Sequence, residues 1–204
     1  MTTSKSILVV HAGRYGSTAE VAEAIADELR SCGATVESRP ARDVFSIESY
    51  DAVVVGSAVY SAKWLPEAMR FVETNHEGLS RRRVAYFTLC MELTRVPEDQ
   101  DREVPVFVDP ELGQPPRVEG KLGYFERTHL LSAILQPVLD AAPGVEPLGV
   151  GVFRGKLEYR GLRFVDWLTV KLTWWLFKRA PEGDYRNWEA IRSWAAGLGS
   201  VLLP

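Results

Sequence analysis

Runs of aliphatic residues alternate with helical stripes along most of this chain. Positions 7–10 are all aliphatic with no polar alternation, which predicts a strand that is buried on both faces. The predicted strands are 6–11, 34–39, 52–56, 83–88 and 148–153. The predicted helices are 17–31, about 66–73, 129–141, about 161–179 and a segment from near Asn187. Strands separated by helices at this spacing predict an α/β fold, with a doubly wound parallel sheet of five strands flanked by helices.

The turn that follows the first strand, residues 12–18, has the features of a phosphate site. Gly13 and Gly16 allow the backbone to turn tightly, and a helix begins directly afterwards. The start of a helix presents unpaired backbone N–H groups and the positive end of its dipole, which together favour an anion. We therefore predict that this turn binds a phosphate group.

Side chains in the same turn narrow the kind of phosphate. Ser17 and Thr18 add hydroxyl donors, Arg14 adds a full positive charge, and Tyr15 lies among them. The lysine of a nucleoside-triphosphate loop and the full glycine pattern of a dinucleotide-binding turn are both missing. A terminal phosphomonoester, such as the 5′-phosphate of FMN, fits this turn. The alternative is a plain strand-to-helix turn in which Ser17 is the N-cap.

Three loops are expected to meet at one edge of the sheet. In doubly wound sheets, ligands bind beyond the carboxyl ends of the strands, near the point where the strand order reverses. The loops at that edge are 12–18, 57–64 and 88–92. The third loop contributes Thr88, Leu89 and Cys90 to the predicted cofactor site, although Cys90 also suits a plain buried thiol.

The second of these loops suits the flat ring of a flavin. It opens with the small residues Ser57 and Ala58, and Val59 follows them in the predicted cofactor site. Small residues let backbone N–H groups approach the ring and tune its potential. Tyr60 and Trp64 follow, and their aromatic faces would cover the ring. In the alternative, Trp64 and Pro66 open the next helix and pack on the surface.

Composition limits the class of protein. A chain of 204 residues with 46% hydrophobic content suits one domain over 1–204. The formal charge of −3 argues against a nucleic-acid partner. The two cysteines and three histidines lack metal-ligand spacing, so we expect no metal. No apolar run reaches the ~18 residues of a membrane span. No hydrophobic leader precedes Lys5, which predicts a reducing cytoplasm.

Two pairs of segments resemble known proteins. Residues 7–21 together with 53–72 resemble the flavodoxin-like superfamily. Residues 151–159 with 183–189 are similar to the flavodoxin-domain branch that includes the menaquinone-dependent protoporphyrinogen IX dehydrogenases of haem biosynthesis. The resemblance implies non-covalently bound FMN, a five-stranded sheet and one- or two-electron redox chemistry. The family's phosphate loop usually opens with a hydroxyl residue. This chain has Ala12–Gly13 there, so backbone N–H groups and the arginine of the loop would have to compensate.

Two functions fit these features. The first is an FMN-dependent oxidoreductase that passes electrons from a reduced substrate to a quinone. The second is a flavodoxin-like electron carrier that has no substrate of its own and docks to redox partners. Small carriers of this kind are usually strongly acidic, which steers their partners. This chain instead has a basic aromatic segment and a long insertion, which favours the enzyme. The sequence assigns no catalytic residue.

Two segments extend the predicted sheet. Residues 94–128, after the fourth strand, form an insertion in which 104–108 suits a short edge strand. A long ordered loop beside a ligand site is often a lid or a subunit contact. Within the extra helical segment 156–182, residues 160–179 interleave tryptophan with lysine and arginine, which suits peripheral contact with an anionic membrane surface. A lipid-dissolved quinone would then be reached from the inner membrane face. In the alternative, this helix packs against a second subunit of a homo-oligomer.

Three polar residues near predicted element boundaries have structural and functional readings. Asn187 is predicted to be the N-cap of the last helix. The sequence does not fix the role of Arg186, and one option is that it pairs with an acidic edge of the substrate, such as a porphyrin propionate. His11 ends the first strand, and we expect it to be structural rather than a contact to the ribityl chain.

Overall fold

The computed structural model describes residues 4–96, 104–158 and 182–203. At its centre is a sheet whose strands follow the order β2-β1-β3-β5-β7-β6 and pair in parallel. The strands along this path are β2 (Thr35–Pro40), β1 (Ser6–Ala12), β3 (Ala52–Tyr60), β5 (Arg83–Cys90), β7 (Val150–Arg154) and β6 (Val106–Val108). The first five of them are the five predicted strands in a doubly wound order, so the predicted α/β fold class is confirmed.

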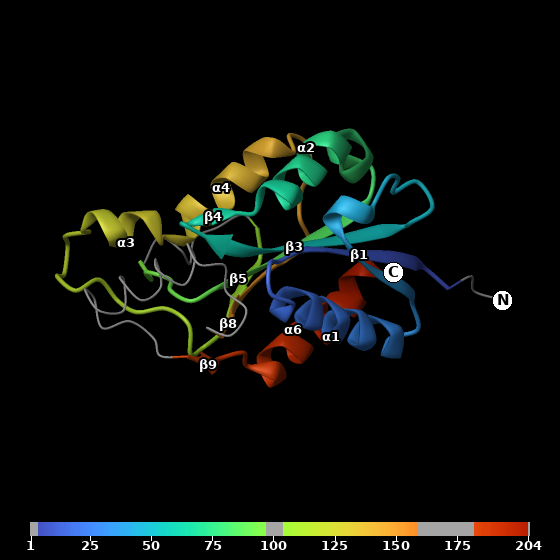
Figure 1. Ribbon diagram of the computed structural model, residues 1–204. Helices are drawn as coiled ribbons and strands as arrows, with labels where there is room; N and C mark the ends of the chain where they lie inside the picture. Colours follow the sequence, from blue (N-terminus) through green and yellow to red (C-terminus); the bar gives the residue numbers. More distant parts are fainter. Residues whose placement is uncertain (1–3, 97–103, 159–181, 204) are drawn as a thin grey trace.

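Helices cover both faces of the sheet (Figure 1). α1 and α6 pack on one face, and α2 and α4 pack on the other. The helices within the described ranges are α1 (Ser17–Ser31), α2 (Pro66–Ser80), α3 (Tyr124–Thr128), α4 (Leu131–Ala141) and α6 (Trp188–Leu202), with a 3-10 turn, η1 (Ala41–Asp43). Successive side chains of β1 point to opposite faces, so Ile7 and Val9 join the core under α1 while Leu8 and Val10 join the other. All four are fully buried, as expected for a parallel strand covered on both sides.

Two elements extend further than the sequence pattern predicts. β3 runs on through residues 57–60, where it pairs antiparallel with β4 (Lys63–Trp64). α2 continues to Ser80 instead of ending near 73, because Leu79 carries its buried stripe two turns further. The extra length of β3 matters for function, since the second predicted loop becomes a hairpin.

The insertion and the segment after β7 add two small features to the sheet. β6 lies within the insertion and pairs parallel with β7, so the expected edge strand is present. β8 (Lys156–Leu157) and β9 (Gly183–Asp184) form a separate antiparallel ribbon. The helix predicted at 161–179 and the membrane surface at 160–179 lie outside the described residues. Within the ranges that are described, no helix has both the length and the apolar character needed to cross a bilayer.

Candidate functional site

The carboxyl ends of three neighbouring strands bring the three predicted loops together. β3 lies between β1 and β5 and pairs with both. The register aligns Ala12 with Ser57, and Ser57 with Thr88, so the ends of these strands form a row across the sheet. The loops that follow therefore lie at one edge, where doubly wound sheets bind their ligands.

The first loop leads into α1 through a glycine cap. Gly16 has a φ of 88°, in the left-handed region that glycine tolerates best, and is the N-cap of α1. No side chain makes a capping hydrogen bond to the start of this helix. The alternative in which Ser17 is the N-cap is therefore wrong, because Ser17 is the first residue inside the helix. A helix start without a side-chain cap suits a bound anion.

Thr18 places an orphaned hydroxyl beside this helix start. The residue is 1% exposed, and its Oγ1 has no hydrogen-bond partner among the described residues. Gly13 lies directly against it, since a Cβ built on Gly13 would stand 2.5 Å from Thr18 Oγ1. A buried polar atom without a partner costs about 1–3 kcal/mol. A phosphate oxygen bonded to this hydroxyl would remove that cost, so the residues present fit the phosphate of FMN.

Arg14 and Tyr60 connect the first loop to the second. The guanidinium carbon of Arg14 lies 4.5 Å from the centre of the Tyr60 ring, which is a cation–π distance. Arg14 is exposed, and Tyr15 beside it is half-buried. The structure thus brings a residue predicted for the phosphate next to a residue predicted for the ring, although the two are far apart in the sequence.

The second loop is the tip of the β3–β4 hairpin. Ser61 and Ala62 at the tip have φ values of 50° and 61°, so two residues that are not glycine adopt the left-handed conformation. This conformation at both central positions matches the twist of the flanking strands, and it costs roughly 1–2 kcal/mol per residue. Ala58 and Val59 lead into the hairpin and are half-buried, as is Tyr60. The hairpin therefore holds Tyr60 at the edge of the site.

Trp64 is part of the core and cannot cover a flavin ring. The residue is 4% exposed, and its Nε1 donates a hydrogen bond to Thr88 Oγ1 at 3.1 Å. Its ring meets the ring of Tyr86 edge-on, with 5.8 Å between the centroids. The prediction that Trp64 faces the cofactor is therefore wrong. For Trp64 the alternative of surface packing is wrong as well, because β4 turns the indole inward. Pro66 does open α2 and is exposed, as that alternative expected.

Four further residues of the predicted site are buried: Ser57, Thr88, Leu89 and Cys90. Ser57 Oγ donates to the carbonyl of Ala58 at 2.9 Å and accepts from the Leu65 N–H at 3.0 Å, which ties β3 to the residue that precedes α2. Burial raises the pKa of the Cys90 thiol to about 12, so this thiol stays protonated near neutral pH. The plain buried thiol is the better description of Cys90.

A cavity of about 360 Å³ opens next to the end of β5. It is walled by residues after β5, by the insertion and by the last residue of β7, including Met91, Leu93, Leu112, Arg117, Phe125 and Arg154. Arg154 is the register partner of Cys90, which places the cavity at the same edge as the predicted loops. The predicted loop 88–92 and the position of Arg154 at a strand end indicated part of this cavity from the sequence, whereas most of its other walls come from the irregular insertion.

A second cavity, of about 270 Å³, lies on the β2 side of the first loop. His11 and Arg14 line it together with Arg42 of η1 and Glu67 of α2. Burial lowers the pKa of His11, and the charge of Arg42 lowers it further, while Glu23 and Asp43 raise it. His11 is therefore neutral at neutral pH. Across the part of the chain that the structure describes, no three side chains of the metal-binding types gather into a cluster.

The burial of His11 predicts a pH-dependent stability. The unfolded chain binds a proton at His11 near its ordinary pKa of 6.5, whereas the folded protein binds it only at lower pH. The contribution of His11 is thus fully present above that value and is lost as the pH falls through the lower, folded pKa. Urea unfolding at about pH 7.5 and about pH 5.5 should show a smaller acid loss for His11→Gln than for the unchanged protein. Equal losses in both proteins would contradict this.

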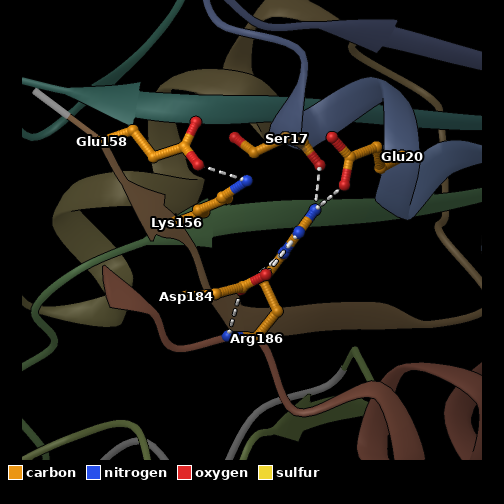
Figure 2. Close-up of polar contacts among 6 residues, drawn as sticks. All are labelled: Ser17, Glu20, Lys156, Glu158, Asp184 and Arg186. Atoms are coloured by element: carbon orange, nitrogen blue, oxygen red, sulfur yellow. Dashed lines mark hydrogen bonds and ion pairs between the residues drawn. The ribbon is translucent and has the colours of Figure 1, made fainter. Parts of the chain in front are cut away.

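Arg186 and Asn187 both have partners within the protein. Arg186 donates to Asp184 and to Glu20, so it is not available to a substrate carboxylate (Figure 2). The option in which Arg186 pairs with a porphyrin propionate is therefore wrong. The Asn187 side-chain oxygen accepts from the Ala190 N–H at 3.1 Å, which confirms Asn187 as the N-cap of α6.

Several of the solved structures to which this chain is similar are flavodoxins. A short-chain flavodoxin associated with a bacterial microcompartment is 14% identical, with 97% of this chain and 99% of that chain covered at a TM-score of 0.50. The flavodoxin of Megasphaera elsdenii is 15% identical over 94% of this chain and 98% of its own, at a TM-score of 0.48. A Fusobacterium nucleatum flavodoxin mutant bound to flavin mononucleotide is 16% identical, covering 42% of this chain and 51% of its own at a TM-score of 0.33.

The family is shown by the sequence itself. No curated protein matches the chain. The family model described as flavodoxin domain matches residues 8–183, which include most of β1, the hairpin and the insertion. The chain therefore belongs to the flavodoxin-domain family, an assignment that supports FMN as its cofactor and places it among redox proteins.

Proposed function

We propose that this protein is an FMN-dependent oxidoreductase that passes electrons from a reduced organic substrate to a quinone. The FMN phosphate would be held by backbone N–H groups between Gly13 and Ser17, by the Thr18 hydroxyl and by the charge of Arg14. These groups are a helix start without a side-chain cap, an orphaned donor and an exposed cation at one loop. When bound, FMN supplies the redox chemistry by accepting two electrons from a reduced substrate and passing them to an acceptor.

The flavin ring would lie beside the Tyr60 ring and the backbone at the ends of β3 and β5. Backbone N–H groups of this edge can donate to the ring and tune its potential. The buried hydrogen bonds of Ser57 and of Trp64 with Thr88 stiffen the two strand ends and so fix the positions of those backbone groups. In this proposal Trp64 supports the end of β5 from within the core and makes no contact with the flavin ring.

The cavity beside β5 is the observation that favours an enzyme over a carrier. An electron carrier needs an exposed ring edge and no space for a substrate, whereas an oxidoreductase must bind a substrate next to the ring. About 360 Å³ of space lies directly after Cys90, and its walls are built largely by the insertion. A volume of this size is typical of sites for small organic molecules.

The walls of this cavity indicate the kind of substrate. Met91, Leu93 and Phe125 offer apolar surface, which suits a ring system. The Arg154 guanidinium carbon lies 4.9 Å from the centre of the Tyr185 ring, and its Nη1 lies 3.4 Å from a Glu111 carboxylate oxygen. A cation held at the rim in this way can bind a substrate carboxylate. A porphyrinogen, with an apolar macrocycle and acidic side chains, meets both requirements.

The proposed function predicts quinone-dependent turnover. Protein saturated with FMN should oxidise protoporphyrinogen when a menaquinone analogue is the acceptor. Arg154→Met should raise KM severalfold with little change in kcat, because it removes a substrate contact that is equal in the ground and transition states. Steady-state absorbance of the oxidised porphyrin gives both constants.

Two controls make this assay decisive. Arg39→Met removes an arginine that pairs with Glu37 on the edge strand β2, and it should leave KM unchanged. FMN uptake without oxidation of protoporphyrinogen would reject the proposed reaction. Reduction of the bound flavin by a redox partner under those conditions would favour the carrier.

The quinone acceptor remains a prediction from the sequence. Residues 160–179, whose basic and aromatic pattern suits an anionic membrane surface, lie outside the described residues. Contact with a membrane at that segment would bring the flavin site to a lipid-dissolved quinone.

A further inference from the structure

Arg186 joins the C-terminal part of the chain to the first turn of α1. Its Nε and Nη2 donate to the two carboxylate oxygens of Asp184 at 2.8 and 2.6 Å. Its Nη1 donates to Glu20 Oε2 at 2.8 Å and to the Ser17 carbonyl at 3.3 Å (Figure 2). Ser17 and Glu20 belong to the first turn of α1, in which the phosphate loop ends. The guanidinium therefore contacts the helix start from which the phosphate would be bound.

This guanidinium is buried and held from several directions. The Arg186 side chain is only 3% exposed, and its guanidinium carbon lies 4.4 Å from the centre of the Trp188 ring. The backbone of Asp184 is fixed in turn, because Asp184 lies in β9 and is the register partner of Lys156 in the antiparallel strand β8. A buried arginine is stable only when its donors are paired, and here all three guanidinium nitrogens have acceptors. The contact is therefore a built connection between the β8–β9 ribbon and α1.

Charge makes the connection important for an anion at this helix start. Glu20 lies in the first turn of α1, where a bound phosphate and a carboxylate would repel each other. Arg186 pairs with Glu20 directly. Lys156 adds a second positive charge nearby, although its closest partner is Glu158, at 2.6 Å. Without Arg186, the carboxylates of Glu20 and Asp184 would lose their shared cation next to the phosphate loop.

We propose that Arg186 is a positioning residue for the FMN phosphate. It fixes the first turn of α1 through the Ser17 carbonyl, and it neutralises Glu20 so that this turn accepts an anion. Arg186 needs no contact with FMN to do so. This role rests on the proposed FMN site at residues 13–18.

The role predicts a loss of affinity that depends on the phosphate. Arg186→Met should raise the Kd for FMN by about tenfold, because the charged hydrogen bonds that fix the helix start are lost. The Kd for riboflavin, which has the same ring and no phosphate, should stay unchanged. Quenching of flavin fluorescence measures both constants on the full-length apoprotein. A merely structural role of Arg186 would weaken both ligands alike.

Arg30→Met is the matched control. Arg30 also pairs with two carboxylates, Glu23 and Asp27, but it does so at the other end of α1. Its removal should leave both Kd values unchanged. The double variant Arg186→Met/Glu20→Gln should recover part of the FMN affinity, since the unpaired carboxylate is then gone.

The outcomes separate this inference from the proposed function. Failure of the unchanged protein to bind FMN would reject the FMN site itself. FMN binding that is unaffected by Arg186→Met, or parallel losses of FMN and riboflavin, would overturn the role of Arg186 alone. Arg186→Lys covers the case in which the methionine variant does not fold. It keeps the charge but loses the two-pronged contact to Asp184, so it should give a smaller loss that is again specific to FMN.

Discussion

Thr18→Val should stabilise the apoprotein and weaken FMN binding at the same time. The Thr18 hydroxyl is buried without a partner, so its removal should raise the free energy of unfolding by about 1 kcal/mol. If the same hydroxyl donates to the FMN phosphate, its loss should cost about 1.5–3 kcal/mol of binding, or roughly 10- to 150-fold in Kd. Urea unfolding of the apoprotein and fluorescence titration with FMN measure the two effects. A gain in the stability of the apoprotein together with a loss of FMN affinity is the result expected when a hydrogen-bond donor serves a ligand and not the fold.

Thr18→Ser is the control for this experiment. Serine keeps the hydroxyl and loses only a methyl group, so its FMN affinity should stay close to that of the unchanged protein. The variants Thr18→Val and Thr18→Ser should also bind riboflavin with the same affinity, because riboflavin has no phosphate. A valine variant that binds FMN normally would show that the orphaned hydroxyl of Thr18 has no part in the site.

Gly13→Ala should damage both the fold and the FMN site. The new Cβ would stand 2.5 Å from Thr18 Oγ1 and 2.7 Å from Thr18 Cβ, closer than real side-chain contacts allow. Forcing an extra methyl into a packed site costs about 1–3 kcal/mol. The relief of this clash must shift either the loop or the first turn of α1, so FMN affinity should fall by more than about tenfold. Urea unfolding and FMN titration again give both values.

Two further variants test whether this clash is the cause. Gly197→Ala places a methyl on α6 where no other atom lies within 4 Å, so it should instead stabilise the protein by about 0.5–1 kcal/mol. Gly13→Ala/Thr18→Ala removes the Oγ1 atom that the new methyl would strike at 2.5 Å and keeps the Cβ at 2.7 Å, so the double variant should recover part of the stability lost in the single one. An equally unstable double variant would show that the contact with the Thr18 hydroxyl is not the reason for the loss.

The first loop could be predicted from the sequence because its information is local. Strand, glycine turn and helix follow one another within residues 6–31, and each is set by its own residues. The parallel topology correctly placed the second and third loops beside the first, at the carboxyl-terminal edge of the sheet. The roles of their side chains were predicted less well. Trp64 was expected at the ring and is buried, because β4 folds back on β3 and turns the indole under Thr88.

The cavity beside β5 and the Arg186 contact could not be predicted in the same way. The cavity walls come from the strand end after β5, from the insertion and from β7, which only the folded chain brings together. Arg186 contacts Glu20 across 166 positions of sequence. No local pattern identifies such a partner, because a charged residue before a helix cap looks the same in the sequence whether its side chain is in solvent or is buried against a distant carboxylate.

By itself, the sequence predicted the five parallel strands, the helices between them and the glycine turn that leads into α1. Each depends on hydrophobic periodicity or on glycine conformation over a few neighbouring residues. Only the tertiary structure decided which side chains face the site, which support it from the core, and which carboxylates Arg186 neutralises. These depend on burial and on distances between segments far apart in the chain, and the free energies of burial and charge pairing are set by the folded surroundings.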